Sequence, residues 1–81
     1  MRISIFGLGY VGSVSGACLA SMGHQVIGVD SNPEKVSMVH SGQSPVVEGR
    51  LDDLVEQMVK AGRLSATTDG AEAVMQTDVS L

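Results

Sequence analysis

A glycine-rich turn between two apolar runs constrains this fold more than any other feature of the sequence. Gly7, Gly9 and Gly12 fit the G-x-G-x-x-G spacing, directly after the short apolar run of residues 3–6. Such a spacing occurs by chance in loops, but here a segment of helical character follows it, and a second apolar run follows that segment. The order strand, glycine turn, helix, strand is typical of a βαβ unit that binds a dinucleotide.

The glycines predict a binding site for a diphosphate. Gly7 permits a tight turn out of the strand, and the absent side chain of Gly9 lets the backbone approach a pyrophosphate closely. The N–H groups of Tyr10, Val11 and Gly12 then lie at the start of a helix, where they have no helical partner and the helix dipole favours anions. A Walker-type phosphate loop is excluded because no Gly-Lys-Ser/Thr sequence follows the turn.

An acidic residue, Asp30, ends the second apolar run and lies 18 residues after Gly12. In a dinucleotide site, an acid about 20 residues beyond the glycines accepts hydrogen bonds from the adenosine ribose hydroxyls. The same carboxylate would repel a 2′-phosphate, so the sequence predicts NAD rather than NADP as the cofactor. Lys35 is a candidate contact to the ribose or to a phosphate, although an exposed lysine on a helix fits the sequence equally well.

The chain as a whole alternates between helical and strand patterns. The helix after the turn carries apolar residues at Val11, Val14, Cys18 and Met22, and Gly23 is expected to end it. The other expected elements are a strand at 26–29, a helix at 33–40 capped by Asn32, a loop at 43–50, a helix at 51–60, a strand at 64–67, a short helix at 71–75 and the entry to a strand at 78–81. The predicted fold class is therefore α/β, the N-terminal half of a doubly wound parallel-sheet (Rossmann) domain, with residues 1–81 forming a partial dinucleotide-binding domain.

No residue of the chain is predicted to be catalytic or to bind a metal. Cys18 is the single cysteine, and its place on the apolar side of a helix predicts a packing role rather than a reactive thiol. His24 and His40 flank helix ends, where a histidine more often contacts terminal carbonyls or solvent, and neither has a partner at metal-ligand spacing. Glu48 lies in the expected loop, where a ligand contact and a solvent-exposed position both stay open.

The composition excludes several other classes of protein. A hydrophobic content of 43% is too high for a disordered segment, and a net charge of -4 without a basic cluster disfavours binding to nucleic acid or to an anionic membrane. No run reaches the 18 apolar residues of a membrane span, and one cysteine fits a reducing compartment, so a cytoplasmic location is expected. The unpaired edge of so small a sheet favours a piece of a longer protein.

The opening MRISIFGLGYVGSVSGACLASMGHQVIGVD and the later SPVVEGRL resemble the N-terminus of the UDP-glucose/GDP-mannose dehydrogenase family. The resemblance covers essentially all 81 residues. The GLGYVG turn, the GHQVIGVD strand and the SPVVE loop together are much more specific than the glycine spacing alone. The opening and the terminal DVSL look closest to the members that act on GDP-mannose, with the members that act on UDP-glucose as near competitors.

The resemblance implies a two-step oxidation of a nucleotide-sugar C6 alcohol to a carboxylate, as from GDP-mannose to GDP-mannuronate, with two NAD molecules and a catalytic cysteine. Tyr10 and Val11 fall on the family's cofactor-contacting pair, Asp30 on its ribose-binding acid, and Lys35 on a basic cofactor-contacting position. The resemblance further implies a nucleotide-sugar substrate, bound through a domain outside these residues, and a homo-oligomeric full-length enzyme.

The sequence also departs from the family pattern. Gly49 and Arg50 stand where family members usually have Pro-Gly, and Cys18 does not match the catalytic cysteine, which the resemblance places beyond Leu81. The 81-residue chain alone is therefore expected to be inactive. Two alternatives stay open: a non-catalytic nucleotide-binding remnant, and another Rossmann dehydrogenase, such as a 3-hydroxyacyl or hydroxy-acid enzyme, in which the SPVVE loop is not expected.

Overall fold

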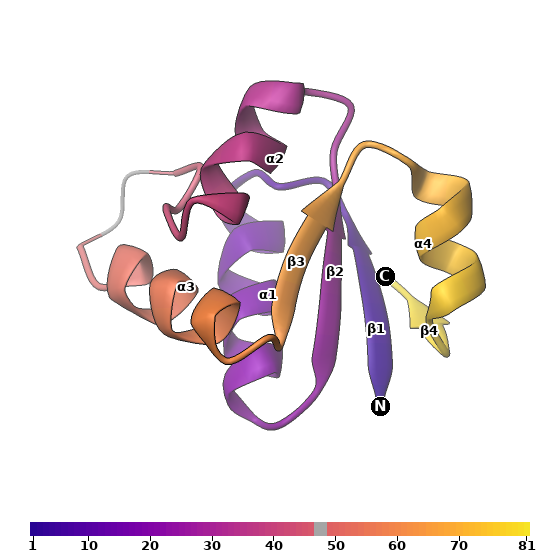
Figure 1. Cartoon of the computed structure of the whole chain (residues 1–81), viewed down its shortest axis with the longest axis horizontal. Helices are drawn as coiled ribbons and strands as arrows, with labels where there is room; N and C mark the ends of the chain where they lie inside the picture. The colour runs from indigo at the N-terminus through magenta and orange to yellow at the C-terminus, as the bar shows by residue number, and fades with distance from the viewer. Residues whose placement is uncertain (47–48) are drawn as a thin grey trace.

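The chain folds as a four-stranded parallel sheet with helices on both of its faces (Figure 1). The computed structural model describes residues 1–46 and 49–81. In chain order the elements are β1 (Arg2–Phe6), α1 (Tyr10–Ser21), β2 (Gln25–Val29), α2 (Pro33–His40), α3 (Leu51–Lys60), β3 (Leu64–Thr67), α4 (Gly70–Gln76) and β4 (Val79–Ser80). The strand order is β3-β2-β1-β4, which confirms the predicted α/β doubly wound class.

The two central strands are apolar because both of their faces are covered. Ile3 and Ile5 of β1 are buried and pair with Val26 and Gly28 of β2. Near-continuous apolar runs of this kind are typical of parallel strands between helical layers. Ser4 is the exception: it is fully buried, and its hydroxyl contacts the hydroxyls of Ser80 (2.6 Å) and Thr77 (3.0 Å), which tie β4 and the end of α4 to β1.

The strand order places a topological switch point between β1 and β4. The chain leaves β1 toward β2 and β3 on one side, then crosses through α4 and returns to pair β4 with the other side of β1. α1 and α3 lie on one side of the sheet and α4 lies on the other (Figure 1). In open α/β sheets, ligands bind at such a point, just outside the carboxyl ends of the strands. The turn after β1 lies at this position.

The buried face of α1 differs from the predicted one. Of the residues predicted to form its apolar side, Val11 is 75% exposed, Met22 is 71% exposed and Cys18 is exposed. The helix turns other residues, mostly with small side chains, toward the sheet: Ser13, Gly16, Ala17 and Ala20.

Close packing explains this difference. A methyl group at Gly16 would already be in van der Waals contact with side chains of Ile5 and Val26, at 3.6 Å, so this face of the helix has room for small side chains only. The predicted packing role of Cys18 is therefore wrong.

The other predicted elements are confirmed with small changes in their bounds. Asn32 caps α2 by accepting a hydrogen bond from the N–H of Glu34 (2.9 Å), and α4 extends one residue beyond the prediction at each end. In the expected loop, residues 43–46 and 49–50 contain neither helix nor strand. Val47 and Glu48 lie outside the described residues, so the ligand contact considered for Glu48 stays a prediction.

His40 makes a contact that the sequence did not predict. Its side chain lies at the end of α2, and its Nε2 hydrogen-bonds the carbonyl of Ala66 in β3 at 2.7 Å. β3 is one of the two outer strands of the described sheet, so this bond occupies an acceptor that would otherwise face outward from the sheet edge.

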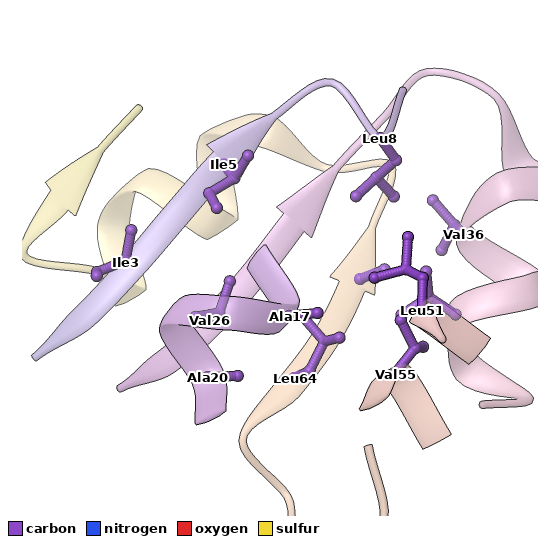
Figure 2. Packing of buried hydrophobic residues seen from close by; sticks show 12 residues of the cluster. Ile3, Ile5, Leu8, Ala17, Ala20, Val26, Val36, Leu51, Val55 and Leu64 are labelled. Atoms are coloured by element: carbon purple, nitrogen blue, oxygen red, sulfur yellow. The ribbon is translucent and has the colours of Figure 1, made fainter. Parts of the chain in front are cut away.

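The hydrophobic core lies between the sheet and the helices α1, α2 and α3 (Figure 2). Figure 2 shows side chains of the strands and of α1 and α3 converging on one cluster. Its fully or nearly fully buried members are Ile3, Ile5, Leu8, Ala17, Ala20, Val26, Val36, Val39, Leu51, Val55, Leu64 and Ala66. Within residues 1–46 and 49–81, no helix is both long and apolar enough to cross a membrane.

Candidate cofactor site

The turn after β1 has the tight geometry that its glycines predict. Gly7 has a φ of +97°, which is rarely open to residues with a side chain. Its N–H donates to the carbonyl of Val29 at 2.7 Å, so the end of β1 is fixed beside the end of β2. The turn therefore begins at a defined position at the carboxyl edge of the sheet.

The third glycine is required by packing within the protein itself. A Cβ on Gly12 would lie 1.8 Å from the carbonyl oxygen of Gly7, so α1 begins in direct contact with the turn. Gly9 behaves differently, because a Cβ there would meet no atom of the described residues within 4 Å. The space in front of Gly9 is thus open, as the predicted approach of a pyrophosphate requires.

Four consecutive backbone N–H groups at the start of α1 precede the first hydrogen bond of the helix. The N–H of Ser13 donates to the carbonyl of Gly9 at 2.9 Å and is the first that the helix satisfies. Among the residues that the structure describes, no acceptor contacts the N–H groups of Gly9, Tyr10, Val11 or Gly12. Such unsatisfied donors, with the helix dipole behind them, fit a bound anion.

Asp30 lies at the same corner of the sheet as the glycine turn. Its Oδ2 accepts a hydrogen bond from the N–H of Leu8 (2.8 Å), and its Oδ1 accepts one from the N–H of Asn32 (2.9 Å). The pKa of the Asp30 carboxyl is lowered, mainly by the hydrogen bond from the N–H of Leu8 and next by that from the N–H of Asn32. The Lys35 ammonium lowers this pKa further but more weakly, while burial of the carboxyl raises it in part. Asp30 is therefore ionised at neutral pH.

The lowered pKa of Asp30 predicts a stability that depends on pH. Because the folded state holds the carboxylate form, its contribution is complete above the ordinary carboxyl pKa of about 3.9 and is lost as the pH falls through the lower folded-state value. We therefore expect the stability difference between wild type and Asp30→Asn to shrink between pH 7 and pH 3. Urea unfolding of both proteins at several pH values measures this difference in unfolding free energy. A difference that stays constant with pH would contradict the lowered pKa of Asp30.

Lys35 also lies at this corner, as the sequence suggested. Its Nζ lies 3.9 Å from Oδ2 of Asp30, and 37% of its side chain is exposed, against 13% for Asp30. An ion pair this exposed contributes less than about 1 kcal/mol to stability. The ammonium group is therefore free to reorient toward a ligand at little energetic cost.

Sequence reasoning missed the residues that hold the turn in place. Leu8 is only 4% exposed, and its side chain packs over Gly28, where a Cβ would lie 2.6 Å from Leu8 Cδ2. The N–H of Leu8 donates to Asp30, and its carbonyl accepts from the hydroxyl of Ser13 at 3.1 Å. An apolar residue between the two glycines was the available sequence signal for Leu8, since an exposed turn residue would more often be polar.

The part of the chain that the structure describes contains no group of three His, Cys, Asp or Glu side chains arranged to hold a metal ion. The exposed Cys18 lies on α1, outside the corner formed by the turn and Asp30.

These features together define a dinucleotide-binding Rossmann domain. They are a parallel sheet with a glycine turn after its first strand, N–H groups without a described acceptor at the start of the next helix, and an acid at the end of the second strand. The family model described as "UDP-glucose/GDP-mannose dehydrogenase family, NAD binding domain" matches residues 1–81. The chain belongs to this family and corresponds to its NAD-binding domain, so NAD is the cofactor.

Individual relatives agree with the family match. The chain is 54% identical over 80 residues to GDP-mannose 6-dehydrogenase of Pseudomonas aeruginosa, covering 99% of this chain, and 47% identical over 79 residues to UDP-glucose 6-dehydrogenase of Rhizobium meliloti, covering 98%. A crystal structure of a ternary complex of GDP-mannose dehydrogenase from Pseudomonas aeruginosa superposes with a TM-score of 0.96 at 54% identity, covering 99% of this chain. In each of these comparisons the chain spans 18% of the length of the matched protein.

Proposed function

We propose that this chain is the NAD-binding segment of a nucleotide-sugar 6-dehydrogenase that oxidises GDP-mannose to GDP-mannuronate in two NAD-dependent steps. The identity of 54% to a GDP-mannose 6-dehydrogenase favours this substrate. The identity of 47% to a UDP-glucose 6-dehydrogenase supports UDP-glucose as the second candidate. When bound, NAD supplies the hydride acceptor for such an oxidation.

The observation that carries the proposal is the corner where the glycine turn meets Asp30. The unsatisfied N–H groups of Gly9, Tyr10, Val11 and Gly12 donate to the diphosphate, and Gly7 makes the turn that aims them. No side chain of residues 1–46 or 49–81 fills the space in front of Gly9, so the backbone and the phosphates can approach each other.

Asp30 and Lys35 act on the adenosine side of the cofactor. Each carboxylate oxygen of Asp30 already accepts one backbone hydrogen bond and retains capacity for a second, which the ribose hydroxyls supply. The Lys35 ammonium, 3.9 Å from Asp30, contacts the ribose or a phosphate and offsets the local negative charge. These residues bind and orient the cofactor, and none of them is catalytic.

Residues 1–81 form only part of the dinucleotide-binding domain in this proposal. The relatives named above are more than five times as long as this chain, since it spans 18% of their length. The nucleotide-sugar site, the catalytic groups and any homo-oligomer contacts of the whole enzyme then belong to sequence outside these residues. The 81-residue chain alone is expected not to turn over GDP-mannose.

Titration of the chain with NAD and NADP tests the cofactor site. We expect NAD to bind at least about tenfold more tightly, or about 1.4 kcal/mol, because the 2′-phosphate of NADP would lie beside the ionised Asp30. The pair AMP and 2′,5′-ADP serves as a matched control, since these ligands differ only in that phosphate. Equal or tighter binding of NADP, with the same order for the smaller pair, would refute the role given to Asp30.

A further inference from the structure

Ser13 holds one end of the peptide unit that joins Leu8 to Gly9. Its hydroxyl donates to the carbonyl oxygen of Leu8 at 3.1 Å, and Ser13 is only 5% exposed. This peptide bond is trans, so its C=O and its N–H point in opposite directions. A hydroxyl that holds the carbonyl on the buried side therefore turns the N–H of Gly9 toward the open side.

The open side of this peptide is the space assigned to the diphosphate. Among residues 1–46 and 49–81, the N–H of Gly9 has no acceptor, and a Cβ on Gly9 would meet no atom within 4 Å. If the peptide rotated about its flanking bonds, the carbonyl dipole of Leu8 would face the phosphates in place of a donor. The orientation of this one peptide thus decides whether the turn attracts or repels an anion.

We propose that Ser13 is a positioning residue for the cofactor diphosphate, acting through the Leu8–Gly9 peptide. Its hydroxyl keeps the Gly9 N–H directed at the anion. This inference rests on the proposed function, because it assumes that a diphosphate occupies the space in front of α1.

Ser13→Ala isolates the contribution of the hydroxyl. The backbone N–H of Ser13, which donates to the carbonyl of Gly9 at 2.9 Å, stays in the variant. Alanine also keeps the Cβ and favours a helix, so the packing of α1 changes little. Ser15→Ala is the matched control, since Ser15 lies on the same helix and no described residue hydrogen-bonds its hydroxyl.

The test compares ADP with adenosine, which lacks phosphate, in NMR titrations of the 81-residue chain. We expect Ser13→Ala to weaken ADP about tenfold, or about 1.4 kcal/mol, and adenosine by less than about twofold. Ser15→Ala should change neither affinity. An equal loss for both ligands would indicate a merely structural role, and an unchanged ADP affinity would also overturn the inference.

A measurement without ligand separates this inference from the proposed function. The residual dipolar coupling of the Gly9 N–H reports the direction of that bond, and we expect it to change in Ser13→Ala but not in Ser15→Ala. An unchanged coupling would overturn the role of Ser13 whether or not the chain binds nucleotides. Failure of the wild-type chain to bind ADP would instead count against the proposed function.

Discussion

Gly12→Ala is expected to lose at least about 3 kcal/mol of unfolding free energy. Its new methyl group would lie 1.8 Å from the carbonyl oxygen of Gly7 and 2.9 Å from the carbonyl carbon. Both contacts are with backbone at the tight turn, so a side-chain rotation cannot relieve them. The first turn of α1 has to move away from the turn after β1, and the free N–H groups then leave their common position.

Gly9→Ala is the matched control for this prediction. Its methyl group would meet no atom within 4 Å in the part of the chain that the structure describes, and Gly9 has an extended backbone conformation that alanine also adopts. We expect a stability loss below about 1 kcal/mol, mostly from a poorer N-cap, together with weaker binding of ADP and NAD. Urea unfolding followed by circular dichroism, with NAD titration of each folded variant, measures both effects. Similar stability losses at Gly9 and Gly12 would contradict the packing described here.

Asp30→Ala is expected to remove about 2–4 kcal/mol of stability and to bring NAD binding below detection. The carboxylate accepts hydrogen bonds from the N–H groups of Leu8 and Asn32, and its side chain is only 13% exposed. Hydrogen bonds to charged groups contribute about 1.5–3 kcal/mol each when their partners are removed from water. Because Leu8 belongs to the glycine turn, loss of the carboxylate also loosens the diphosphate site.

Two further variants sharpen the test of Asp30. Asp30→Asn keeps one acceptor oxygen but directs an amide group toward the other backbone N–H. We therefore expect about half of the stability loss of Asp30→Ala. We also expect no preference for NAD over NADP, because the negative charge is removed. Asp53→Asn removes an exposed acid of α3 and should change neither property. If Asp30→Ala bound NAD as well as wild type does, the ribose assignment would be wrong, whatever its stability.

The glycine turn, Asp30 and the order of the elements could be predicted because each depends on short-range patterns. The positive φ of Gly7 follows from the strand-to-helix turn, and the cap at Asn32 follows from local side-chain chemistry. Each of these features depends on only a few neighbouring residues, so a short stretch of sequence is enough to predict it.

The face of α1 and the contacts of the turn could not be predicted in this way. The helix carries apolar residues on its exposed side and small ones toward the sheet, so hydrophobic periodicity favours the wrong face around Cys18. The hydrogen bond from Leu8 to Asp30 joins residues 22 apart, and that of His40 reaches Ala66 across 26 residues. Such contacts depend on how the strands align, which a single sequence does not give.

The position of β1 between β2 and β4 has a consequence for the order in which the native chain assembles. Ile3 pairs with Val26, only 23 residues away, but also with Val79, at a separation of 76 residues. Closing the longer loop costs about 1 kcal/mol more in chain entropy. We therefore expect β1 to pair with β2 first, which would complete the corner of the glycine turn and Asp30 before β4 is added.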